Sequence, residues 1–151
     1  MMDIHSPDKG DFPELTRVWE RSVRATHDFL PDAYISTLKG LLLMQYLESV
    51  TLFCTRNADL RITGFAGVSR NRLDMLFIDP DYRGQGLGKQ LLDHAVECFG
   101  ISELDVNEQN PQALGFYLKQ GFKVISRSEV DGLGQPYPML RMRRRQAGQA
   151  F

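Results

Sequence analysis

The sequence predicts an α/β (α+β) fold with three layers, in which about four helices flank a mixed central sheet of about six to seven strands. Three observations predict this class. Residues 50–55 and 61–70 are apolar segments of strand length around a short polar turn, which is typical of an antiparallel hairpin. Residues 73–106 have the pattern strand, glycine-rich turn, helix, strand, which requires a right-handed parallel crossover. The length of 151 residues fits one domain.

The first third of the chain is predicted to contain a short strand and two helices. Residues 3–6 form the strand. A helix follows at residues 12–24, because apolar residues recur there at helical spacing after capping residues and Pro13. The segment 25–30 ends this helix, and Pro31 opens a second one that extends to about residue 48.

The remaining elements alternate more regularly. The hairpin turns at residues 56–59, and Gly64 and Gly67 mark a β-bulge in its second strand. The later elements are a strand at 73–78, a helix at 87–99, a strand at 101–106, a helix at 110–119 and strands near 122–129 and 137–143. We expect one domain over residues 1–145 and a disordered tail over residues 146–151.

Composition excludes several classes of partner. A net charge of −1 and a pI near 6.3 give no field that demands nucleic acid or a membrane surface. The longest apolar run, residues 41–44, is too short to cross a bilayer, and the N-terminus has no leader-like pattern, so we expect a cytoplasmic protein. The basic segment 141–145 is predicted to lie on an edge strand with a solvated face, and Cys54 and Cys98 to be buried free thiols.

The glycine-rich turn at residues 83–89, called the glycine turn below, is the most informative segment. Gly84, Gly86 and Gly88 let main-chain N–H groups approach a ligand, and the next helix directs its positive end to the same place, which favours a phosphate. A dinucleotide fingerprint needs glycine or alanine where the chain has Lys89. A Walker-type loop fails at two positions, since it needs glycine at Arg83 and serine or threonine at residue 90.

What fits is the pattern R-x-x-G-x-G, carried by Arg83, Gly86 and Gly88. A second pattern follows at residues 107–122, where Asn110 precedes Tyr117 by seven residues and Gly-Phe closes the segment. Asn110 is also a good helix N-cap. Together these patterns resemble the GCN5-related N-acetyltransferase (GNAT) family, well over residues 60–143 and only in outline before them. The resemblance implies acetyl-CoA-dependent transfer to a primary amine of a small molecule or a peptide.

The resemblance also implies a binding mode for acetyl-CoA that needs no metal. The strand around residue 77 binds pantetheine through its main chain, so we expect it to separate from the strand at 101–106. The glycine turn holds the pyrophosphate, with charge from Arg83 or Lys89, and Asn110 binds the coenzyme arm or orders water beside it. The coenzyme-binding residues implied are Leu76, Phe77, Ile78, Arg83, Gly84, Gln85, Gly86, Leu87, Gly88, Lys89, Asn110 and Tyr117.

Tyr117 matches the family's proton donor for the leaving thiolate. A phenol is a weaker acid than a thiol by about 2 kcal/mol, so we expect a lowered pKa or a concerted transfer. Three general bases stay open: Asp105 on the strand after the glycine-turn helix, Glu108 nearby, and His27 in the break between the first two helices. His5 and His94 are predicted to be surface residues.

The motifs leave the function class open to one alternative and do not identify the acceptor or the oligomeric state. The alternative function is an acyl-CoA sensor or scaffold without transfer. The acceptor amine and the choice between a monomer and a homodimer are not determined by these motifs.

Overall fold

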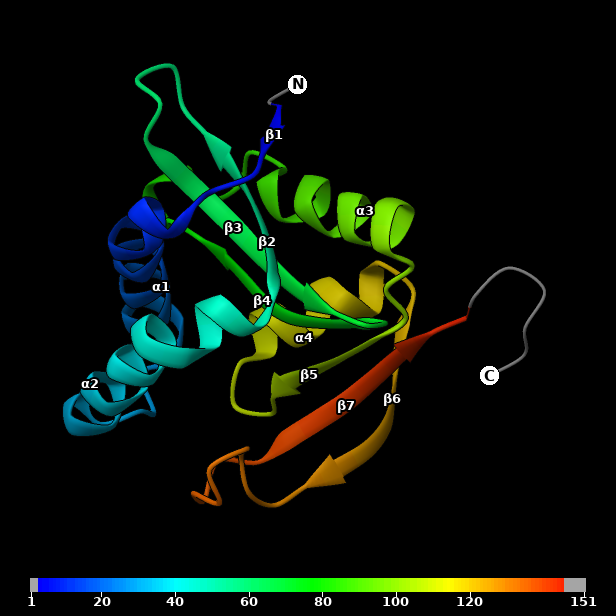
Figure 1. Cartoon of the computed structure of the whole chain (residues 1–151). Helices are drawn as coiled ribbons and strands as arrows, with labels where there is room; N and C mark the ends of the chain where they lie inside the picture. The colour runs from blue at the N-terminus through cyan, green and yellow to red at the C-terminus, as the bar shows by residue number, and fades with distance from the viewer. Residues whose placement is uncertain (1–2, 146–151) are drawn as a thin grey trace.

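The computed structural model of the chain describes residues 3–145 and has one seven-stranded mixed sheet with helices on both faces (Figure 1). The strand order is β1-β2-β3-β4-β5-β7-β6. The strands are β1 (Ile4–His5), β2 (Thr51–Arg56), β3 (Ile62–Ser69), β4 (Arg72–Ile78), β5 (Glu103–Asn107), β6 (Phe122–Ser128) and β7 (Met139–Arg144). The α-helices are α1 (Phe12–Thr26), α2 (Asp32–Leu41), α3 (Leu87–Phe99) and α4 (Pro111–Lys119). The predicted class and three-layer arrangement are confirmed.

Each face of the sheet has its own apolar core, because neighbouring strand residues point to opposite sides. On β2, Phe53 packs with residues of α3 and α4, whereas Cys54 packs with residues of α1 and α2. Only the first of these cores extends under β5, where Leu104 and Val106 are buried. The alternate residues of β5 face the side that α1 and α2 leave uncovered, so charged groups occupy it.

The sheet separates in its middle, as predicted. β4 and β5 are parallel neighbours, but their pairing is confined to Arg72 with Glu103 and Leu73 with Leu104. β3 pairs with β4 as far as Ile78 on the other side. From Asp74 onward, the edge of β4 that faces β5 therefore lies along a gap, and its main-chain groups are available to a ligand.

The predicted hairpin is confirmed as β2 and β3, with irregular register beside both glycines. The second helix is shorter than predicted. α2 ends at Leu41, and a π-helical turn (Leu42–Tyr46) and a 3₁₀ turn (Leu47–Ser49) complete the segment. The change of helix type keeps Leu42 and Leu47 buried, so burial of these side chains overrides helical regularity.

The predicted edge position of the last strand is wrong. β7 lies between β5 and β6, and β6 is the edge strand. The basic side chains of β7 find acidic partners on β5, since Arg141 bonds to Asp105 and Arg143 lies 3.6 Å from Glu103. These arginines are about half exposed, whereas Leu140 and Met142 are buried on the other face, so the alternation of β7 is compatible with an inner position and the ion pairs add a small stabilisation.

Two further predictions need correction. Cys54 is a buried free thiol as expected, but Cys98 is exposed, because the whole last turn of α3 (residues 97–100) is exposed. His5 is exposed as predicted, whereas His94 is half-buried with its ring 4.7 Å from that of Phe53.

The tail predicted at 146–151 lies outside the described residues. None of the helices formed by residues 3–145 combines the length and apolar character needed to cross a bilayer.

Candidate active site

The glycine turn has the backbone conformation that its glycines predict. Gly84 and Gly86 are left-handed, with φ of 75° and 79°. A Cβ at either would meet no atom within 4 Å, so conformation rather than space requires glycine there. Gly88 differs: it lies in the first turn of α3 with ordinary φ, and a Cβ there would lie 3.6 Å from the Phe116 ring.

The first N–H groups of α3, from Leu87 onward, have no acceptor within the helix and point toward the glycine turn with the positive end of the helix dipole. Two cations lie beside them. Lys89 is held by Asp93, with 2.6 Å between Nζ and Oδ2. Arg83 is exposed and forms no ion pair with any residue in 3–145. An anion bound in the turn would therefore lie near Lys89, which already pairs with Asp93, and near Arg83, which has no ion-pair partner among residues 3–145.

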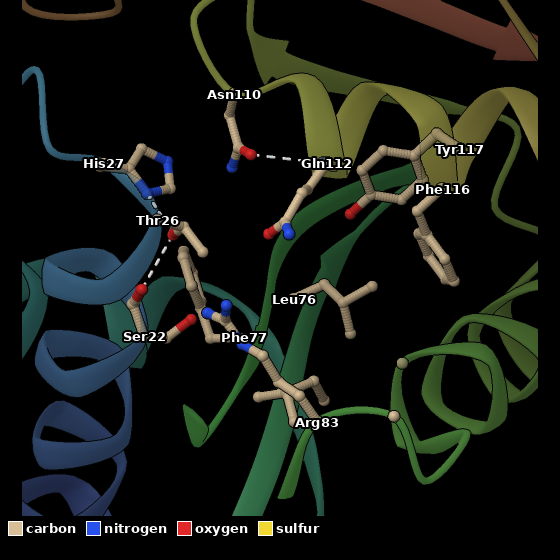
Figure 2. A pocket seen from close by; sticks show the side chains of 14 residues that line it. Ser22, Thr26, His27, Leu76, Phe77, Arg83, Asn110, Gln112, Phe116 and Tyr117 are labelled. Atoms are coloured by element: carbon tan, nitrogen blue, oxygen red, sulfur yellow. Dashed lines mark hydrogen bonds between the residues drawn. The ribbon is translucent and has the colours of Figure 1, made fainter. Parts of the chain in front are cut away.

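The gap between β4 and β5 opens into a cavity of about 310 Å³ (Figure 2). It is continuous with the glycine turn, since Arg83, Gly84 and Gly88 line both this cavity and a smaller one that adds Gly86, Leu87 and Lys89. The predicted strand residues Leu76, Phe77 and Ile78 form one wall, and Asn110 and Tyr117 form another. Of the predicted coenzyme-binding residues, Gln85 alone lines neither cavity; it is exposed on the turn.

Asn110 and Tyr117 enter the cavity from the two ends of α4. The Asn110 side-chain oxygen caps the helix by accepting from the Ala113 N–H at 3.3 Å, which leaves its NH₂ group for the cavity. Tyr117 is 8% exposed, its ring packs edge-on against Phe116 and Phe122, and Figure 2 shows its hydroxyl turned into the cavity. Burial raises the pKa of this hydroxyl, opposite to the lowering considered from the sequence.

His27 lies on the opposite wall, at the end of α1. It is only 9% exposed, so the prediction of a pocket residue is favoured over that of a solvent-facing loop residue. Burial, with a further contribution from the positive charge of Arg83, lowers the pKa of His27 to about 4, and Asp28 opposes the shift. The imidazole is therefore neutral at pH 7 and carries one nitrogen lone pair.

The two candidate carboxylate bases are both held by arginines. Asp105 accepts from Arg72 at 2.6 Å and from Arg141 at 3.1 Å. Burial acts to raise the pKa of Asp105, but these hydrogen bonds lower it overall. The pKa of Glu108 is likewise lowered, by hydrogen bonds from Arg127. Both carboxylates are poor proton acceptors in this arrangement.

A second, smaller cavity of about 100 Å³, called the passage below, adjoins the first. The two share six residues: His27, Leu76, Phe77, Asn110, Ala113 and Tyr117. Leu73, Met75 and Val106 give the passage apolar walls, and Asp74 and Asp105 also line it. The gap between β4 and β5 thus has the larger cavity on the side of the glycine turn and the smaller one away from it.

Sequence patterns missed the residues that bridge distant segments. Tyr34 on α2 donates a hydrogen bond to Asp131 in the loop between β6 and β7. Tyr34 also stacks on Tyr137, and Phe29 continues the aromatic row toward His27. These contacts join residues that are far apart in the sequence, so no local sequence pattern predicts them. Thr26 and Ser22 were also missed, although a threonine in the last helical turn before a histidine is a readable local signal.

The profile described as "Acetyltransferase (GNAT) domain" matches residues 32–143. The chain belongs to the GNAT family. A GNAT relative from Salmonella typhimurium, named peptidyl-lysine N-acetyltransferase YjaB, is 44% identical over 94% of this chain and 97% of its own length. The Escherichia coli protein of the same name is 47% identical over 85% of this chain and 87% of its own.

Two solved structures of N-acetyltransferases have the same fold as this chain. The solution structure of apo-form YjaB from Escherichia coli has a TM-score of 0.86 and 43% identity, covering 95% of this chain and 97% of that one. PaiA N-acetyltransferase from Thermoplasma acidophilum, crystallised in complex with coenzyme A, has a TM-score of 0.70 and 25% identity, covering 95% and 99%. This chain is an acetyl-CoA-dependent N-acetyltransferase. No cluster of three or more potential metal ligands occurs in residues 3–145.

Proposed function

We propose that this enzyme is a peptidyl-lysine N-acetyltransferase, which transfers the acetyl group of acetyl-CoA to a lysine side-chain amine. The observation that carries the proposal is the passage, which is lined by Tyr117 and His27 but by no residue of the glycine turn. Its apolar walls suit the methylene stem of lysine. The names of the two YjaB relatives support the same acceptor.

We assign the coenzyme to the larger cavity and the glycine turn. Backbone N–H groups of residues 84–89 bind the pyrophosphate, and Arg83 adds a charge-assisted contact. The open edge of β4 at Leu76–Ile78 hydrogen-bonds the pantetheine arm and directs an N–H to the acetyl oxygen. The free NH₂ of Asn110 contacts the same arm. Acetyl-CoA itself supplies the acetyl group as an activated thioester.

The proton steps follow from the two walls of the cavity. A lysine ammonium has a pKa of about 10.4, so an imidazole of pKa about 4 cannot deprotonate it before attack. The acceptor therefore enters as the free amine. As the N–C bond forms and the nitrogen becomes acidic, Nε2 of His27 accepts its proton. As the C–S bond breaks, the Tyr117 hydroxyl protonates the sulfur.

Because burial raises the pKa of Tyr117, complete proton transfer ahead of C–S cleavage is unfavourable, and we propose a concerted transfer. His27 is preferred over Asp105 and Glu108 because arginines already occupy both carboxylates. No observation specifically favours a sensor without transfer activity.

The test uses two matched peptides. One has a blocked N-terminus and a single lysine; the other has a free N-terminus and arginine in place of that lysine. We expect acetyl-CoA-dependent acetylation, located by mass spectrometry, on the lysine side chain of the first peptide only. Acetylation confined to the free N-terminus, or to small amines, would overturn the lysine assignment.

The catalytic control is Tyr117→Phe, which keeps the buried ring and removes the proton. We expect kcat to fall by about 10² or more, with the KM for acetyl-CoA nearly unchanged. Unchanged turnover would remove Tyr117 from the mechanism while leaving the acceptor assignment standing.

We propose the cytoplasm of a bacterium as the setting, in line with the two enterobacterial relatives. The free thiols of Cys54 and Cys98 suit a reducing compartment. A monomer or homodimer with no nucleic-acid or membrane partner remains the prediction.

A further inference from the structure

The hydroxyl of Thr26 lies between a backbone carbonyl and the His27 ring. Thr26 is the last residue of α1, and its Oγ1 lies 2.8 Å from the Ser22 carbonyl oxygen one turn earlier. The same Oγ1 lies 2.8 Å from Nδ1 of His27 (Figure 2). Two short contacts thus converge on one hydroxyl, which has a single proton to donate.

The chemistry of the three groups decides where the protons lie. The Ser22 carbonyl can only accept, so the Thr26 proton must point to it; otherwise two oxygens would face each other at 2.8 Å without a proton between them. The remaining contact at Thr26 Oγ1 is then satisfied only if Nδ1 of His27 carries a proton and donates it. Nε2 is left with the lone pair.

We infer that Thr26 is a positioning residue, which holds His27 in the Nδ1–H tautomer with the lone pair of Nε2 directed into the cavity. The inference rests on the proposed role of His27 as base. It matters because a proton on Nε2 would occupy the place where the proton of the attacking amine must go.

The surroundings support a fixed ring. His27 is buried, and the Phe29 ring lies 5.4 Å away by centroid distance. The Thr26 hydrogen bonds therefore set the tautomer of a ring whose position packing already constrains.

The structural test reads the tautomer directly. The chain has three histidines, so ¹⁵N-histidine labelling gives few ring signals, and subtraction of the His27→Gln spectrum identifies those of His27. In the wild type we expect Nδ1 to have the shift of a protonated ring nitrogen and Nε2 that of an unprotonated one. Thr26→Val should move both shifts toward the average of the two tautomers, whereas Thr26→Ser, which keeps the hydroxyl, should leave them in place.

The kinetic test uses the same variants. We expect Thr26→Val to lower kcat about tenfold, the equilibrium value of one neutral hydrogen bond, with the KM for acetyl-CoA unchanged and with Thr26→Ser close to wild type. Unchanged ring shifts in Thr26→Val, with thermal unfolding showing an intact fold, would overturn the inference. Full activity of His27→Gln would instead reject His27 as base, even if Thr26 still set the tautomer.

Discussion

The two sides of the cavity are built by different means. On the side that we assign to the coenzyme, the glycine turn and the start of α3 offer main-chain N–H groups in a conformation set by a few adjacent residues. On the side that we assign to the acceptor, His27 lines the cavity together with residues of β4 and α4, and Tyr34 donates a hydrogen bond to Asp131, 97 positions away in the sequence. Backbone recognition thus depends on local conformation, and side-chain recognition depends on the assembled fold.

The largest expected effect concerns His27 and is the dependence of the free energy of unfolding on pH. The pKa of His27 is about 4 in the folded state, below its ordinary value of 6.5. Between these values the unfolded chain binds a proton that the folded chain does not, so the free energy of unfolding falls as pH decreases from 6.5 toward 4. The loss attributable to His27 is about 3 kcal/mol over that window.

Urea unfolding of wild type and His27→Gln at several pH values measures this effect. The variant should show a shallower decrease between pH 6.5 and 5, and His5→Gln, which changes an exposed histidine, should follow the wild type. Parallel curves for wild type and His27→Gln would mean that His27 is solvated, which would remove the contrast between the two sides.

The next effect compares the two cations of the coenzyme side. Arg83→Gln removes an uncommitted charge and should weaken acetyl-CoA binding roughly thirtyfold, as expected for a hydrogen bond to a charged group. Lys89→Gln should weaken it about threefold, because Asp93 already holds Lys89. Isothermal titration with acetyl-CoA measures both, and equal losses would show that the Lys89–Asp93 pair opens on binding.

The smallest effect tests whether backbone conformation alone defines the glycine turn. Gly86→Ala places a Cβ on a left-handed residue and should cost about 1 kcal/mol of stability or coenzyme affinity. Gly115→Ala in α4 is the matched control, since a Cβ there also meets nothing within 4 Å but the conformation is helical, and it should stabilise slightly. Similar outcomes for the two changes would show that left-handed geometry is not needed at Gly86.

This contrast also explains what could be predicted from the sequence. The left-handed glycines of the glycine turn and the Asn110 cap could be predicted because each depends on neighbours a few residues away. The role of Tyr117 stays a prediction, although its side chain lines the cavity. The separation of β4 from β5 followed from the family resemblance. The inner position of β7 was mispredicted, because local pattern cannot order two antiparallel strands when either order buries the same face. The arginines that neutralise Asp105 come from two other strands and became visible only in the fold.

Arg83 lines both the larger cavity and the cavity at the glycine turn, and its charge also lowers the pKa of His27. A pyrophosphate bound beside Arg83 would cancel part of that charge and so weaken one of the two causes of the low pKa of His27, while burial, the larger cause, would remain. The occupancy of the cavity and the basicity of His27 are therefore coupled through this one side chain.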